Sequence, residues 1–163
     1  MTSKNRPKFL SGQSLVEVVV SIGIAVILAI SLITTSLITQ KSSRSARNNS
    51  QATKLVQQTI EQLRVMRDRR GFSTSTFPSA PTTTCFTFNT PDLNVPSTWN
   101  LTSGCSTPTV SLGTTIFTRK VEMIDQGASA EKRLITVTVS WDESGQTRSV
   151  KSQTVLGLWQ DFP

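Results

Sequence analysis

The sequence predicts an α+β chain in which one long N-terminal helix packs on a small antiparallel β-sheet. Two observations favour the helix: a long apolar run continues into an amphipathic pattern, and no proline occurs between Pro7 and Pro78. A third favours the sheet, because apolar and polar residues alternate after Gly113. We expect a basic leader at 1–12, a membrane-spanning helix at 13–40, its amphipathic continuation at 41–70, a Ser/Thr/Pro-rich loop region at 71–114 and the sheet at 115–163.

The net charge of +7 is concentrated near the N-terminus. Residues 1–12 carry +3 and residues 41–70 carry +6, whereas 13–40 and 71–163 each carry −1. A compact basic domain that grips nucleic acid is therefore not expected. His is absent and there are two Cys, which excludes Ser-His-Asp and Cys-His catalysis and His-bearing metal sites within this sequence. We expect no enzymatic activity, no cofactor and no metal site.

Residues 15–38 form an apolar run of 24 residues with a single charge. A helix of ~20 apolar residues spans a bilayer. A cleavable secretory signal has a shorter apolar core and a small-residue cleavage site, and neither is found here. Simple anchoring is the plainest reading. The flanking charges leave the orientation open, because three bases precede the run and four lie in 41–54.

Glu17 is the single charge in this run. A carboxylate at the centre of a spanning helix costs ~2.5–3.5 kcal/mol on insertion scales, and less near the boundary. No Lys or Arg lies within two turns of it inside the span. Either Glu17 reaches the headgroups, or it pairs with a group from outside its own span. The residues alone leave both readings open.

Residues 8–20, K-F-L-S-G-Q-S-L-V-E-V-V-V, closely resemble the class III signal of type IV pilins and pseudopilins. In that signal a short basic leader ends in Gly and is followed by a pattern like F-T-L-I-E that opens a long apolar helix. Gly12 matches the Gly before the scissile bond, and Ser14 and Glu17 match the second and fifth mature residues. Gln13 departs from the usual Phe.

The resemblance implies a processing and assembly pathway. A prepilin peptidase on the cytoplasmic face would cleave after Gly12 and methylate the amine of Gln13, leaving the head outside the cytoplasm. The carboxylate of Glu17 would pair with the N-terminal ammonium of a neighbouring subunit. The implied partners are other pilins or pseudopilins through helix–helix packing, the prepilin peptidase and an inner-membrane assembly platform. The chain would first lie in the inner membrane and later in a pilus or pseudopilus at the cell surface.

An amphipathic stripe predicts that the helix continues to about residue 70. From Ala52 to Met66 the apolar or small residues fall on one helix face. We expect this stripe to pack on the sheet of the same chain, although part of it could contact neighbouring helices. Gly71 suits the left-handed residue after the last turn. The basic run 64–70 could touch DNA, but a solvated helix end is the commoner role of such a run, and no aromatic residue accompanies it.

Residues 71–113 include 18 Ser or Thr, a loop composition with scattered aromatic anchors that favours a partly packed excursion over a free linker. Cys85 and Cys105 would close a loop of roughly 20 residues, worth ~3 kcal/mol if bonded. Two free thiols are the alternative. Free thiols need a reducing compartment, whereas the resemblance implies that this part of the chain lies outside the cytoplasm.

Strands are expected at 115–124, 133–141 and 147–159, as an antiparallel meander. The alternation places Ile135, Val137, Val139 and Trp141 on one face, and Asp142–Gly145 is a turn signal. This strand order is similar to the minor pilins of the type IV pilus modification group and to one minor pseudopilin type of type II secretion. Some pilin-like heads bind calcium, but no loop here has the ligand density of a calcium motif.

The expected function is that of a minor pilin-like structural subunit of a type IV pilus. One alternative is a minor pseudopilin of a type II secretion system. A second, from another class, is a single-pass anchored binding module whose head recognises a ligand outside the cytoplasm.

Overall fold

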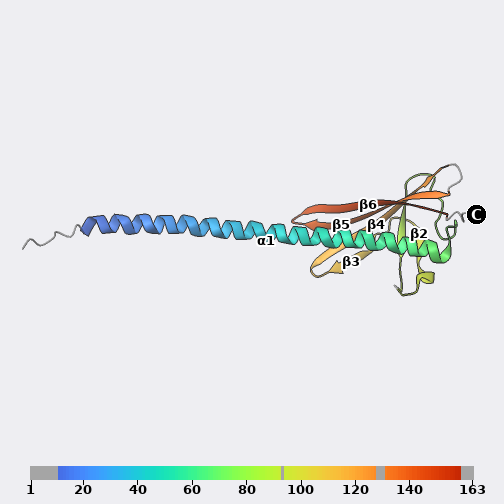
Figure 1. The fold of residues 1–163 in the computed structure, drawn as a ribbon, viewed down its shortest axis with the longest axis horizontal. Coiled ribbons are helices and arrows are strands. Elements are labelled where there is room, and N and C mark those ends of the chain that lie inside the picture. Colours follow the sequence, from blue (N-terminus) through green and yellow to red (C-terminus); the bar gives the residue numbers. More distant parts are fainter. Residues whose placement is uncertain (1–10, 93, 128–130, 159–163) are drawn as a thin grey trace, which may run out of the picture. The chain divides into compact units, whose positions relative to one another are not determined.

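The structure is a computed structural model that describes residues 11–92, 94–127 and 131–158, with side chains from Leu15 onward. It divides into two units, 1–44 and 45–163. Helix α1 runs from Ser11 to Arg70 (Figure 1). Its first part forms all of the first unit that the structure describes, and its second part is the first element of the second unit. Helix α1 starts two residues before the expected position 13, and Gly12 does not interrupt it. The expected leader lies mostly outside the described residues, as does Trp159.

The end of α1 follows the predicted capping pattern. Gly71 has φ 78°, and its N–H donates to the carbonyl of Arg67 at 2.8 Å. A single bond of this kind closes the left-handed helix cap, which glycine adopts without steric cost. Arg67, Arg69 and Arg70 lie in the last turn, where positive charge complements the helix dipole.

The second unit contains a six-stranded antiparallel sheet, so the α+β class is confirmed. The strands are β1 (Thr84–Asn89), β2 (Asn100–Ser103), β3 (Thr109–Leu112), β4 (Thr115–Gln126), β5 (Lys132–Glu143) and β6 (Gln146–Gly157). Their order is β2-β1-β4-β5-β6, and β3 pairs with the start of β4 on the same edge that β1 uses further along. The expected meander is present as β4-β5-β6.

The loop region expected at 71–114 is corrected by the structure, which places three strands and the short 3-10 helix η1 (Pro96–Thr98) within it. Thr is favoured in strands, so a Ser/Thr-rich composition does not exclude them. In β1 the side chains of Phe86 and Phe88 are buried, at 2% and 1% exposure. The two side chains are two residues apart and so lie on the same face of the strand.

The second unit, 45–163, is called the head below. Its hydrophobic core lies between one face of the sheet and the second half of α1 (Figure 1). The predicted helix stripe is confirmed, because Ala52, Val56, Leu63 and Met66 are at most 1% exposed. The predicted strand face is confirmed as well. It is formed by Ile135, Val137, Val139 and Trp141, which are at most 5% exposed.

The turn between β5 and β6 also matches its prediction. Ser144 and Gly145 both have positive φ, at 56° and 77°, and they connect the paired residues Glu143 and Gln146. Two-residue hairpin loops of type I′ require positive φ at both central residues. The turn fixes the register that places Trp141 opposite Arg148.

Replacing Ile135 by Ala tests the assignment of the sheet faces. Ile135 is fully buried against the helix, so the change is expected to lower the free energy of unfolding by about 2–5 kcal/mol. The matched control is Leu134→Ala on the opposite, half-buried face, with a smaller loss. Urea unfolding of the full chain in detergent, followed by tryptophan fluorescence, measures both. Equal losses would contradict the face assignment.

Candidate functional site

The expected cleavage position lies in the first turn of α1. Gly12 and Gln13 have helical backbone, and the side chain of Gln13 lies outside the described part of the structure, as do residues 1–10. Glu17 follows Gln13 by four residues, or about one helical turn. The structure thus places the residues of the expected processing and assembly site on one continuous helix start.

Glu17 is exposed within an apolar helix surface. The large apolar side chains from Leu15 to Ile38 are between 50% and 73% exposed, so the described residues leave them largely uncovered. Among the described residues no Lys or Arg lies within ion-pair distance of Glu17. By length and composition α1 could cross a membrane. On such a helix a carboxylate either reaches the headgroups or pairs with a group from outside the described residues.

Four hydroxyl groups in and just after the apolar segment bond within the helix. Ser31, Thr34, Thr35 and Thr39 each donate to the carbonyl four residues earlier, at 2.8–2.9 Å. Each bond removes the cost of bringing an unpaired hydroxyl into an apolar environment. An ionised carboxylate only accepts hydrogen bonds, so Glu17 cannot donate to a carbonyl of its own helix as these four hydroxyls do.

The disulfide between Cys85 and Cys105 is present. Cys85 lies in β1, and Cys105 follows β2 by two residues, so the bond closes the β1–β2 excursion with a sequence separation of 20. A loop of this length restricts the unfolded chain by ~3 kcal/mol in the entropy model. Gly104 donates its N–H to the carbonyl of Cys85 beside it.

A buried ion pair attaches the segment after the helix to the sheet. Asp125 looked isolated in the sequence, but its carboxylate accepts from Arg133 Nε at 2.8 Å, from Ser79 Oγ at 2.7 Å and from the Ala80 N–H at 2.9 Å. Arg133 is 2% exposed and also donates to the carbonyl of Phe77. Burial raises the pKa of Asp125, but the hydrogen bonds from Ser79, Arg133 and Ala80 and the charge of Arg133 outweigh it and hold the pKa below its usual value.

Arg119, in β4, is a second cation between the helix and the sheet. Its guanidinium donates to Thr59 Oγ1 at 3.3 Å and to the carbonyl of Phe88 at 3.2 Å, and it lies 5.5 Å from the centre of the Phe88 ring. Burial lowers the pKa of Arg119 from its usual value. These contacts with uncharged groups hold α1 against the sheet. The sequence alone did not indicate this role of Arg119.

The described residues hold no cluster of three or more His, Cys, Asp or Glu side chains that could bind a metal ion. Glu143, beside the β5–β6 turn, accepts a hydrogen bond from Ser45 Oγ at 3.2 Å. This bond joins the hairpin to the helix.

No family model, curated protein or solved structure matches this chain in the comparisons with known proteins.

The Asp125–Arg133 pair predicts an acid-sensitive head. Because the pKa of Asp125 is lowered by folding, its contribution to stability is complete above the unfolded value of about 3.9 and is lost as pH falls through the folded pKa. Urea midpoints measured from pH 6 down to pH 2 should fall for the unmodified chain. Asp125→Asn should lower the midpoint at pH 6 and flatten this acid limb, whereas Asp142→Asn at an exposed position should change neither. An unaltered acid limb in Asp125→Asn would refute the assignment.

Proposed function

We propose that this chain is a minor pilin-like structural subunit, anchored by the first part of α1 in the inner membrane and incorporated through that helix into a type IV pilus. The observation that carries the proposal is Glu17, a solitary carboxylate on an apolar helix surface that the chain does not cover. It stands five residues after Gly12, at the spacing of the class III signal.

The leader gives the proposed orientation. Residues 1–12 carry +3 and remain on the cytoplasmic side, while the head lies outside the cytoplasm. A prepilin peptidase cleaves after Gly12, and the released amine of Gln13 is methylated. A disulfide between Cys85 and Cys105 suits a head in an oxidising compartment.

Assembly follows from the electrostatics of the new N-terminus. Cleavage creates an ammonium group at Gln13, about one turn from Glu17 on the same helix. In the fibre the ammonium of one subunit meets the carboxylate of the next, with apolar side chains around them. In such a low-dielectric setting, removing one partner of an ion pair costs about 3–5 kcal/mol, so the pair selects subunits in the correct register.

The head supports this role through its packing. Its core closes between the second half of α1 and the sheet, so the head needs no partner to cover its apolar helix stripe. The first half of α1 has no such cover, and lipid or neighbouring helices supply it. The same helix therefore carries both the fold of the head and the contacts of the fibre.

The mature N-terminus provides the first test. Mass spectrometry of the protein from a host with an active prepilin peptidase should find a chain that starts at N-methylated Gln13. Gly12→Val should block this cleavage, because the scissile bond follows that glycine. Retention of residues 1–12 in the unmodified protein would rule out the proposed processing.

Glu17→Ala separates processing from assembly. Cleavage should continue, while the amount of protein in sheared surface fibres falls by at least about tenfold, since a lost buried pair costs more than the ~1.4 kcal/mol of a tenfold change. Glu61→Ala is the matched control, because it removes an exposed carboxylate from the other half of the helix. If Glu17→Ala fibres contain the usual amount, the ammonium-pairing role is wrong.

A further inference from the structure

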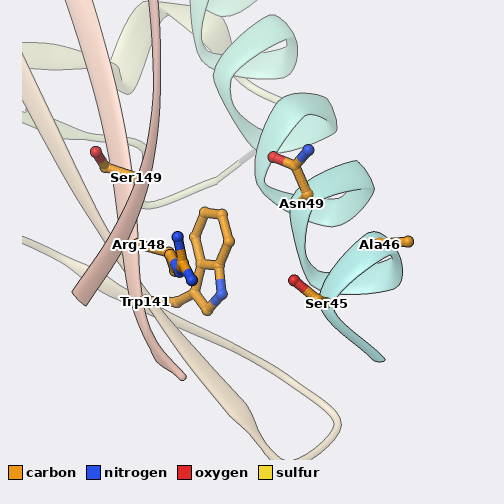
Figure 2. A pocket seen from close by; sticks show the side chains of 6 residues that line it. All are labelled: Ser45, Ala46, Asn49, Trp141, Arg148 and Ser149. Atoms are coloured by element: carbon orange, nitrogen blue, oxygen red, sulfur yellow. The ribbon is translucent and has the colours of Figure 1, made fainter. Parts of the chain in front are cut away.

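A pocket of about 330 Å³ lies at one end of the head, between α1 and the β5–β6 hairpin (Figure 2). This volume is at the lower end of the roughly 300–1,000 Å³ found for ligand sites. The lining residues come from the helix and from both strands of the hairpin: Ser45, Ala46, Asn49, Trp141, Arg148 and Ser149.

The indole of Trp141 is the buried wall of the pocket. The side chain is 5% exposed, and its Nε1 has no hydrogen-bond partner in the described part of the chain. Figure 2 shows this nitrogen on the side of the ring that faces the helix, toward Ser45. An indole N–H only donates, so it needs an acceptor atom. Phe117, at 5.8 Å between ring centres, packs against the indole and helps to fix its direction.

The rest of the lining is also rich in donors. Arg148, the cross-strand neighbour of Trp141, offers guanidinium N–H groups and no acceptor. Asn49 on the helix can donate as well, whereas Ser149 lies on the other face of β6 and its hydroxyl points away from the helix (Figure 2). No Asp or Glu lines the pocket. One acid contacts a lining residue in the described chain: the carboxylate of Glu143 accepts from Ser45. A donor-rich lining with one arginine suits a group with several anionic oxygens, and phosphate is the group that guanidinium binds best in this way.

The sequence position of the pocket indicates the source of that phosphate. Ser45 follows Ile38, the last residue of the apolar run, by seven residues on the same helix, which is about two turns. The basic residues Lys41, Arg44 and Arg47 lie close by in the sequence. Tryptophan and basic side chains gather where a chain leaves the bilayer and meets the headgroups.

We propose that this pocket binds the phosphate of a phospholipid headgroup. The guanidinium of Arg148 pairs with the phosphate, and the Trp141 indole donates to one of its oxygens. The inference rests on the membrane anchoring that is part of the proposed function, and it does not depend on processing or on fibre assembly. Lipid binding here would hold the head at the membrane surface before incorporation.

The indole resonance of Trp141 gives a direct test. The full chain, labelled with nitrogen-15 in dodecyl maltoside micelles, is titrated with dihexanoyl phosphatidylglycerol, with inorganic phosphate or with dihexanoyl glycerol. The Trp141 N–H signal, assigned with Trp141→Phe, should shift saturably with the phospholipid alone. Arg148→Gln should raise the half-saturating concentration at least tenfold. Lys151→Gln, which removes a base from the other face of the same strand, should leave it unchanged.

Four outcomes would overturn the proposal. An equal shift with inorganic phosphate would identify free phosphate as the ligand. No shift in any titration, or an equal loss in Arg148→Gln and Lys151→Gln, would remove the site. A shift that depends on protein concentration without lipid would identify a second copy as the occupant. None of these outcomes bears on cleavage after Gly12, so this proposal and the proposed function fail separately.

Discussion

The apolar surface of α1 must be covered, and the chain supplies that cover for only part of the helix. From Ala52 to Met66 the stripe is buried against the sheet, and the strand face that opposes it is apolar at every position from Ile135 to Trp141 that points inward. From Leu15 to Ile38 the side chains stay largely exposed. Burial of apolar area is the main favourable term in folding and association, and we propose lipid or other helices as the cover of this exposed surface. The fold of the head, the proposed anchoring and the proposed assembly all depend on that division.

The charged groups follow the same division. Inside the head, Arg133 and Arg119 are both desolvated, and both find partners within the chain: a carboxylate for Arg133, and a hydroxyl, a carbonyl and an aromatic ring for Arg119. The Asp125–Arg133 pair joins the segment after the helix to two neighbouring strands and so helps to set their register. Glu17 is different, because the described chain offers it no base. The head thus gives both guanidinium groups partners of its own, although Nε of Arg119 has none in the described part of the chain, and the apolar part of the helix leaves one carboxylate unmatched. This contrast fits the proposed subunit, which folds alone and assembles later.

The features that the sequence predicted were those set by local periodicity. The helix stripe, the inward face of β5 and the Ser144-Gly145 turn each depend on spacings within a single element or hairpin. The pairing of Cys85 with Cys105 could be predicted because the chain has no other Cys. The strands in 71–114 were missed, since Ser and Thr suit loops and strands alike. The Asp125–Arg133 pair and the pocket at Trp141 depend on strand register and on contacts between residues up to about a hundred positions apart, which composition does not encode. The Glu17 site rests on a motif, and its partner must come from another chain.

The most direct measurement of the central claim asks what covers residues 15–38 before and after assembly. A photoreactive amino acid is placed at Ile24, which is 54% exposed, and the chain is cross-linked separately in the membrane fraction and in sheared surface fibres. We expect lipid adducts in the membrane fraction and cross-links to the helices of other pilin-like subunits in the fibres. If the protein is confined to the membrane fraction and forms lipid adducts alone, the helix is an anchor and the chain is not a fibre subunit.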